Sequence, residues 1–202
     1  MSLLYRFIRL TLLVIFKTFF RFEVLHSENV PEKGGVIVVT NHASHLDPMV
    51  VGCAIKKRQA TYMAKRSLFH LPIVGAFVRT FSFPVDREQT QPSTIKEAVR
   101  RLKNGELIVM FPEGSRSRDG SLLEAKRGTG MIATLANAVI VPAFIDGTNK
   151  VWPAGAKFIR RVAKIKVIFG NPIEIKGEES GREYHEKIGN DIMEAIRSLK
   201  CR

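Results

Sequence analysis

Short apolar runs alternate with segments of helical periodicity along most of the chain. Runs rich in β-branched and other apolar residues predict strands at 35–40, 59–64, 81–85, 106–111, 139–145 and 164–169. A further short strand is possible at 172–175. Apolar residues spaced three or four positions apart predict helices between them, at 47–56, within 67–79, and at 94–103, 128–137 and 180–199. Because the two element types alternate, we expect an α/β fold with a mostly parallel central β-sheet flanked by helices.

The helix at 94–103 has the clearest sequence signals of its kind. Thr94 and Glu97 have the spacing of a capping box, in which each side chain satisfies a free backbone N–H of the first turn. Apolar residues then form one stripe that would face the sheet: Ile95, Ala98, Val99 and Leu102. Gly105 follows and predicts the end of the helix.

The N-terminal segment has a different pattern, with apolar clusters interrupted by the basic residues Arg6, Arg9, Lys17 and Arg21. Its longest uncharged run, 10–16, is far shorter than the roughly 20 residues that span a bilayer. The basic side chains fall within about one third of the helix circumference, as in a helix that lies on an anionic membrane surface. Lys17 interrupts the apolar core that a cleaved signal peptide would need. A helix docked on the folded domain is the alternative, but the density of Phe and Leu favours the membrane. We expect residues 1–24 to be an amphipathic membrane-associating segment and 25–202 to be the α/β domain.

The net charge is the most unusual feature of the composition: the 202 residues carry a formal net charge of +13. Such a charge favours anionic partners, namely nucleic acid, an acidic membrane surface or phosphorylated substrates. The chain has no RNA-binding motif, zinc finger or helix-turn-helix pattern, and its basic runs are not interleaved with aromatic residues. We therefore expect no nucleic-acid partner. Its two cysteines, Cys53 and Cys201, form neither a disulfide framework nor a metal-binding pattern.

A histidine and an aspartate, His42 and Asp47, follow the apolar strand predicted at 35–40. The strand would deliver His42 to the carboxyl edge of the sheet, where open α/β sheets bind their ligands. A carboxylate that reaches one ring nitrogen fixes the tautomer of the imidazole, and the other nitrogen can then take a proton from a hydroxyl. No G-x-S-x-G nucleophile motif lies nearby, so the pair indicates a histidine base that acts on a substrate hydroxyl.

Two other predicted strands also lead into charged residues. The strand at 81–85 precedes Asp86 and Arg87, and the strand at 106–111 precedes the long connection 112–127, which is rich in Arg and Lys. Loops of this length inside a compact domain are often functional. If the strands are parallel, their ends meet at one edge, so a base and several guanidinium groups would face one cleft. Arginine binds phosphate through paired charge-assisted hydrogen bonds.

Four blocks, in order, resemble those of the glycerolipid acyltransferases, and most closely the 1-acylglycerol-3-phosphate acyltransferases of the bacterial PlsC type. The blocks are Asn41-His42-x-Ser44-x-x-Asp47, then Gly75-x-Phe77-Val78-Arg79 with Val85-Asp86-Arg87, then Phe111-Pro112-Glu113-Gly114-Ser115-Arg116-Ser117, then Val141-Pro142-Ala143. The matched region spans 36–150, which is most of the chain. Ser115 stands where Thr is common in the family, and the second block is stretched.

The resemblance implies that His42 is the general base for the 2-hydroxyl of a lysophosphatidic acid and that Asp47 orients it. It implies a thioester donor, either acyl-CoA or acyl carrier protein, and phosphatidic acid as product. Substrate binding would fall to Arg87, Glu113, Gly114, Ser115 and Arg116, with possible further phosphate or membrane contacts at Arg79, Lys126 and Arg127. We expect no metal and no cofactor, and a peripheral or monotopic location at the cytoplasmic face of the cell membrane.

Three questions stay open at this level. Either Arg79 or Arg87 could serve the phosphate, and we favour Arg87 because it follows a strand. The acceptor could be another lysophospholipid or an aminolipid. A membrane-surface adaptor without catalysis is a further alternative, although an adaptor has no chemical need for His42, Asp47 and Glu113.

Overall fold

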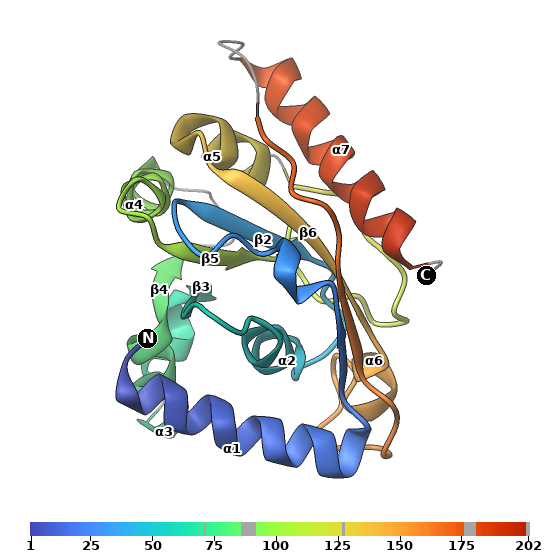
Figure 1. The fold of residues 1–202 in the computed structure, drawn as a ribbon. Helices are drawn as coiled ribbons and strands as arrows, with labels where there is room; N and C mark the ends of the chain where they lie inside the picture. Colours follow the sequence, from blue (N-terminus) through green and yellow to red (C-terminus); the bar gives the residue numbers. More distant parts are fainter. Residues whose placement is uncertain (71, 86–91, 127, 176–180, 201–202) are drawn as a thin grey trace.

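A twisted β-sheet forms the centre of the computed structural model, which describes residues 1–70, 72–85, 92–126, 128–175 and 181–200 (Figure 1). Within these ranges seven strands lie in the order β1-β7-β6-β2-β5-β3-β4. Their bounds are Glu23–Leu25 (β1), Val36–Thr40 (β2), Ala60–Lys65 (β3), Ser82–Val85 (β4), Leu107–Met110 (β5), Val139–Asp146 (β6) and Lys166–Phe169 (β7). Neighbouring strands pair in parallel except β6 and β7, which are antiparallel. The predicted α/β fold with a mostly parallel sheet is thus confirmed.

Helices cover both faces of the sheet (Figure 1). The α-helices are Leu3–Phe20 (α1), Asp47–Ala54 (α2), Pro72–Phe81 (α3), Pro92–Lys103 (α4), Gly128–Ala136 (α5), Thr148–Val151 (α6) and Arg182–Leu199 (α7). Two short 3₁₀ turns, Ser27–Asn29 and Arg66–His70, complete the pattern. α1 and α2 lie below the sheet in this view, and α4, α5 and α7 lie above it.

The side chains of β2 alternate between two hydrophobic clusters, because successive residues of a strand point to opposite faces. Val36 and Val38 pack in the cluster shared with α1 and α2, whereas Ile37 and Val39 pack in the cluster shared with α4, α5 and α7. All five residues of β2 are buried. Burial on both faces explains why the strand is a continuous apolar run. The chain then leaves the sheet at its carboxyl edge, just before His42.

The predicted elements differ from the observed ones in a few places. The sequence gives no signal for β1, which has three residues and pairs with β7, or for α6, which is a single turn. Residues 172–175 form no strand, although Ile173 makes an isolated bridge to Ile140. The capping-box prediction was wrong, because α4 already begins at Pro92 and Glu97 instead binds Arg100 and Arg101. Proline favours the first turn of a helix, where its missing N–H costs nothing.

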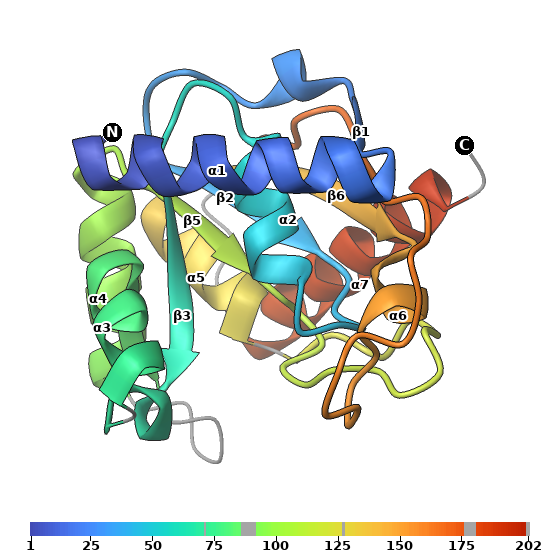
Figure 2. The same ribbon diagram turned by 90° about the horizontal axis from the view of Figure 1, so that it is seen from below.

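α1 runs along the lower edge of the molecule in Figure 1, and the view from below shows it passing next to α2 (Figure 2). One face is docked: Tyr5, Phe16 and Phe20 are buried, and the Tyr5 hydroxyl donates to the carbonyl of Gly52 at 3.3 Å. Arg9 also lies on this face, where its guanidinium binds the carbonyls at the end of α2, those of Cys53 and Ile55. The helix continues into β1, so the expected boundary after residue 24 falls inside a strand of the sheet.

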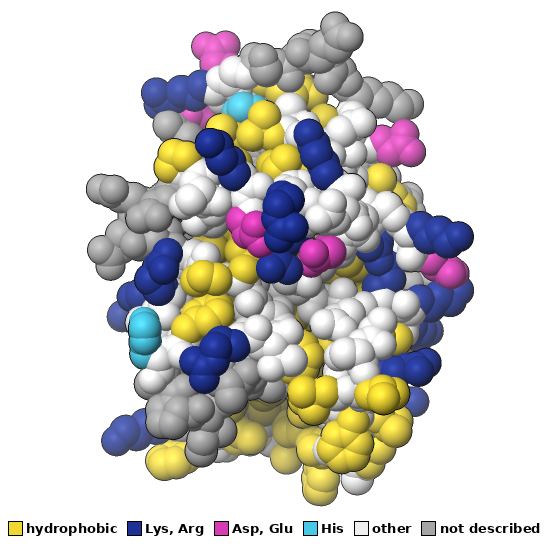
Figure 3. Space-filling model, turned by 90° about the vertical axis from the view of Figure 1, so that its left-hand side faces the viewer, with side chains coloured by type: hydrophobic (Ala, Val, Ile, Leu, Met, Phe, Trp, Pro, Cys, Tyr) yellow, Lys and Arg dark blue, Asp and Glu magenta, His cyan; other side chains and the backbone are white. Residues whose placement is uncertain are grey.

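The outer face of α1 is apolar and exposed. It presents a row of large side chains to the surroundings, namely Leu3, Leu4, Phe7, Leu10, Val14 and Phe19. Hydrophobic side chains accordingly gather at the lower end of the molecule, where α1 lies (Figure 3). Among the helices of the described ranges, none is both long and apolar enough to cross a bilayer.

Candidate active site

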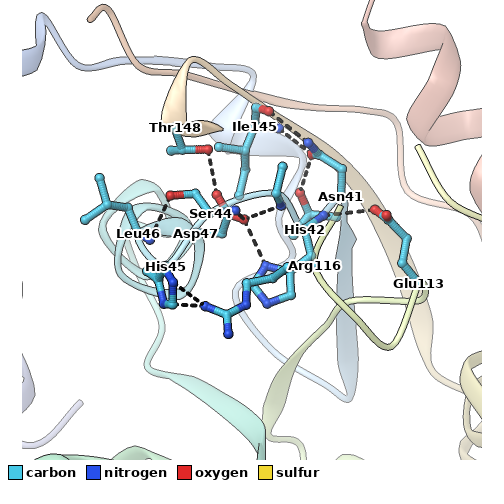
Figure 4. A network of polar contacts seen from close by, with 12 residues as sticks. Asn41, His42, Ser44, His45, Leu46, Asp47, Glu113, Arg116, Ile145 and Thr148 are labelled. Carbon is cyan, nitrogen blue, oxygen red and sulfur yellow. Dashed lines mark hydrogen bonds and ion pairs between the residues drawn. The ribbon is translucent and has the colours of Figure 1, made fainter. Parts of the chain in front are cut away.

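His42 and Asp47 face each other between the end of β2 and the start of α2 (Figure 4). Nδ1 of His42 lies 2.9 Å from Oδ2 of Asp47, and both side chains are almost fully buried. Because the carboxylate can only accept, the hydrogen bond places a proton on Nδ1 of the ring. Nε2 is then the nitrogen that has the basic lone pair.

The carboxylate of Asp47 is held by three further hydrogen bonds. Its Oδ2 atom accepts from the backbone N–H groups of Ala43 and Ser44, both at 2.7 Å. Its Oδ1 atom accepts from the hydroxyl of Thr148 at 2.6 Å. A buried carboxylate without donors would be strongly destabilising, and these donors compensate for its loss of water. They also fix the direction from which Asp47 meets the imidazole.

Thr148 is a site residue that the sequence analysis missed. It is the first residue of α6, and its side chain is buried beside Asp47. A signal existed: Thr148 follows the predicted strand 139–145 by a few residues, so a parallel arrangement brings it to the same edge as His42. Asn41 makes a comparable link, because its side-chain amide exchanges hydrogen bonds of 2.9 and 2.8 Å with the backbone of Ile145 in β6.

The long connection 112–127 fixes the backbone of His42 on both sides of the residue. The N–H of His42 donates to Oε1 of Glu113 at 2.9 Å, and the His42 carbonyl accepts from the N–H of Ser117 at 2.7 Å. The second oxygen of Glu113 accepts from the N–H of Leu123 at 3.1 Å. Glu113 is only 2% exposed, so its carboxylate joins two loops instead of facing the solvent.

Burial raises the pKa of Glu113 to about 7, because the loss of water disfavours the charged form more than the two backbone donors favour it. The negative charge of Asp47 acts in the same direction as burial. Glu113 therefore titrates near neutral pH, whereas an ordinary glutamate titrates near 4.5.

Arg116 lies at the exposed rim of the site and is held by His45. One guanidinium nitrogen, Nη1, lies 3.0 Å from Nε2 of His45 and also contacts Nδ1. The His45 ring packs on Trp152, with 5.0 Å between the ring centres. Burial and then the charge of Arg116 lower the pKa of His45, which keeps its ring neutral and able to accept from the guanidinium.

Two cavities meet at His42. The larger, about 500 Å³, runs between α1, α2 and β3 and is mostly apolar, with Ile8, Leu12, Met49, Leu68, Val78 and Phe81 among its lining residues. The smaller, about 110 Å³, lies toward α5 and includes Gly114, Lys126 and Thr129 in its wall. His42 and Phe111 line both, and their rings stack with 4.0 Å between centres. Arg116 lines the larger cavity together with His45.

The other predicted binding residues are spread more widely. Gly114 has a φ of 68°, a conformation that favours glycine, and Ser115 is exposed beside Arg116. Arg79 lies on α3, where its guanidinium donates to the carbonyl of Phe69 at 2.6 Å. Arg87, with Asp86, and Arg127 lie outside the described residues. In the described part of the chain, no three His, Cys, Asp or Glu side chains are grouped to hold a metal ion.

Known proteins resemble this chain over most of its length. The family model described as "Acyltransferase" matches residues 21–146. The 1-acyl-sn-glycerol-3-phosphate acyltransferase of Bacillus subtilis is 34% identical over 171 residues, which cover 84% of this chain and 82% of that protein. A chloroplastic 1-acyl-sn-glycerol-3-phosphate acyltransferase of Arabidopsis thaliana is 30% identical over 159 residues. These residues cover 77% of this chain and 44% of that longer protein.

A solved structure is similar as well. The crystal structure of PlsC, the 1-acyl-sn-glycerophosphate (LPA) acyltransferase from Thermotoga maritima, aligns with a TM-score of 0.78 and 27% sequence identity. The alignment covers 98% of this chain and 81% of that one.

Replacing Thr148 tests how much Asp47 depends on its fourth donor. We expect Thr148→Val to lower the free energy of unfolding by about 1–3 kcal/mol, because it leaves Oδ1 of a buried carboxylate without a partner. Thr148→Ser is the matched control, since it keeps the hydroxyl and loses only a methyl group. Urea unfolding of the three proteins measures the difference. Equal losses in the two variants would mean that packing, and not the hydrogen bond, gives Thr148 its role.

The raised pKa of Glu113 predicts a pH-dependent stability. Between about pH 4.5 and 7 the unfolded chain loses this proton while the folded chain keeps it, so rising pH favours unfolding. Relative to Glu113→Gln, which cannot titrate, the wild type should lose up to about 3 kcal/mol of stability across this window. Urea unfolding at several pH values measures it, with the exposed Glu124→Gln as control. A difference between wild type and Glu113→Gln that does not change with pH would contradict the assignment.

Proposed function

This chain belongs to the acyltransferase family and is an acyltransferase, and from that premise we propose that it acylates the 2-hydroxyl of 1-acyl-sn-glycerol-3-phosphate. The product would be phosphatidic acid, a precursor of phospholipids. The observation that carries the proposal is the buried His42–Asp47 pair, which opens on a large apolar cavity with a guanidinium at its rim. A base, a space for a hydrocarbon chain and a phosphate ligand are what this reaction needs.

The proposed chemistry begins with proton transfer to His42. Nε2 takes the proton of the acceptor hydroxyl as its oxygen attacks the carbonyl carbon of the thioester. The tetrahedral intermediate then collapses, the C–S bond breaks, and the leaving sulfur takes the proton back from the imidazolium. Asp47 stabilises the charged ring between these steps through the 2.9 Å hydrogen bond to Nδ1. The products are the new ester and the free thiol of the carrier.

The phosphate of the acceptor is assigned to Arg116, with Ser115 beside it. The guanidinium is exposed at the rim of the large cavity and is positioned by a neutral His45, so its charge is available to an anion. Arg87 and the possible additional contact Arg79 rest on the family resemblance, and the possible contact Arg127 rests on the basic composition of its loop. Lys126, which lines the smaller cavity, is a further candidate.

Glu113 and Gly114 support binding through the shape of the loop. The Glu113 carboxylate would repel a phosphate, and both its oxygens accept from backbone N–H groups. Gly114 brings the loop back over the site: a Cβ at this position would lie 2.7 Å from Cδ of Lys126. These two residues thus hold the segment from which Ser115 and Arg116 project.

We place the protein at the cytoplasmic face of the cell membrane, bound peripherally or as a monotopic protein through α1. The exposed apolar face of this helix, with the basic Arg6 and Lys17 also exposed, suits an anionic leaflet. Residues of the opposite side of α1, Ile8 and Leu12, line the large cavity. A lipid acceptor could therefore pass from the leaflet to His42 along the helix. The donor is acyl-CoA or acyl carrier protein.

Replacing His42 tests the proposed reaction. We expect His42→Ala to lower kcat by about a thousandfold or more with the fold intact, because general-base catalysis is lost. The assay pairs a panel of lysophospholipid and aminolipid acceptors with both donors and identifies products by mass spectrometry. His26→Ala, at an exposed histidine, is the control. Retained turnover in His42→Ala would refute the base, and preferential acylation of an acceptor other than 1-acyl-sn-glycerol-3-phosphate would refute the substrate.

Replacing Arg116 tests the phosphate site. Arg116→Ala should raise the KM for the phosphorylated acceptor by about tenfold or more, since a charge-assisted contact is lost, and should leave the KM for the acyl donor nearly unchanged. Arg116→Lys keeps the charge without the guanidinium fork and should fall in between. Initial rates with each substrate varied in turn provide the measurement. Equal increases in the two KM values would contradict a phosphate role.

A further inference from the structure

A second exposed apolar segment lies far from α1 in the sequence. Residues 157–162, Lys-Phe-Ile-Arg-Arg-Val, are all exposed, and the large side chains Phe158, Ile159 and Val162 are 78%, 52% and 64% exposed. Single exposed apolar residues are ordinary, but three within five positions form a patch that usually marks an interaction surface. Neither the family resemblance nor the proposed reaction uses this segment.

The 157–162 segment is held in place at both ends. The N–H of Arg160 donates to the carbonyl of Val151 in α6 at 2.8 Å, and the Trp152 indole donates to the carbonyl of Ala156 at 2.9 Å. After the segment, the buried Ile165 donates from its N–H to the carbonyl of Phe20 at the end of α1, at 2.9 Å. Its exposure is therefore built into the fold.

These contacts bring the segment to the same edge of the molecule as α1. The connection that follows α6, drawn in orange, reaches the lower edge along which α1 runs (Figure 1). Seen from below, this connection runs beside α6 and returns to the end of α1 (Figure 2). The segment 157–162 therefore belongs to a connection that adjoins α1.

The charge of the segment points to an anionic partner. Lys157, Arg160 and Arg161 alternate with the apolar side chains, and the stretch 153–164 contains no acidic residue. Each Lys or Arg near an anionic leaflet contributes about 1 kcal/mol to binding, while the apolar side chains gain by leaving water. Basic residues interleaved with large apolar ones are the composition of interfacial membrane contacts.

We propose that the 157–162 segment is a second lipid contact, which binds anionic phospholipid headgroups through Lys157, Arg160 and Arg161 and inserts Phe158, Ile159 and Val162 into the interfacial layer. The proposal rests on the membrane location given above. The basic charge of the segment and the hydrogen bond that ties the connection to the end of α1, from Ile165 to Phe20, favour an anionic lipid surface over a protein partner.

Such a contact would reach the catalytic loop directly. Ser44 forms an isolated bridge with Pro153, and the N–H of Ala154 donates to the carbonyl of Ala43 at 3.3 Å. The connection that bears the segment is therefore bonded to the loop between His42 and Asp47. With the exposed face of α1 as the first lipid contact, this second contact would help to hold the mouth of the site at the leaflet.

Tryptophan insertion tests the proposal on the full-length protein. Phe158→Trp reports on the segment, and Leu135→Trp, at an exposed position of α5 on the other side of the sheet, is the matched control. With vesicles of phosphatidylglycerol and phosphatidylcholine that contain brominated acyl chains, we expect fluorescence quenching above the background of Trp152 only in Phe158→Trp. Vesicles of phosphatidylcholine alone should give much less quenching.

Binding measurements on two further variants separate this proposal from the membrane location itself. Phe158→Ser/Ile159→Ser and Arg160→Gln/Arg161→Gln should each lower the partition coefficient onto the anionic vesicles by about tenfold, and the second effect should disappear at high salt. Turnover of lysolipid dispersed in detergent should stay at the wild-type level.

If the wild type sediments with the vesicles but Phe158→Trp is not quenched, the second contact is refuted and α1 alone explains binding. If the wild type does not sediment, the membrane location fails as well. If the emission of Phe158→Trp changes only on addition of acyl carrier protein, the segment is a protein-docking surface and the lipid proposal is wrong.

Discussion

The arrangement of the site depends on one buried carboxylate. Asp47 is fully buried, and its two oxygens accept from His42, two backbone N–H groups and Thr148. Because a buried charge is tolerated only with its donors in place, the loop 41–46 and the first turn of α6 have to close around it. The same hydrogen bonds that stabilise the charge give His42 its tautomer and orientation. Folding and the proposed chemistry of the base thus rest on a single group.

The order of the strands explains how these donors meet. β2 lies between β5 and β6, all three in parallel, so the segments that follow them leave the sheet at adjacent points of one edge. The segment after β2 carries His42, the segment after β5 carries Glu113 and Arg116, and the segment after β6 carries Thr148. The last two segments are hydrogen-bonded to the one after β2: Glu113 and Ser117 bind the backbone of His42, and Thr148 binds Asp47. A parallel sheet thereby converts three distant stretches of sequence into one rigid site.

The sequence was sufficient for six of the seven strands in the described residues and for the position of His42, because buried strands are continuous apolar runs and parallel strands end at a common edge. It was insufficient where the outcome depends on tertiary contacts. β1 is a strand because β7 lies beside it, and α6 is too short for a periodic signal. The motif could not reveal that the Glu113 carboxylate turns inward to backbone N–H groups, since a charged residue in a long loop normally faces water. The sequence places Thr148 after a predicted strand and so near the same edge of the sheet, but only the structure shows the hydrogen bond that connects it with Asp47.

The amphipathic pattern of α1 did not predict which of its residues would contact the folded domain. Arg6, Arg9 and Lys17 belong to the helix, whereas Arg21 follows its last residue in a left-handed conformation. Arg9 binds the carbonyls at the end of α2, while Arg6 and Lys17 stay exposed. The helix is apolar on both faces, because one face completes the core and lines the large cavity while the other contacts the surroundings. An element that only anchored the chain would not need the first face, and one that only completed the core would not need the second. A helix that serves both is suited to a substrate whose hydrocarbon chain has to leave a bilayer and enter a protein cavity without crossing water.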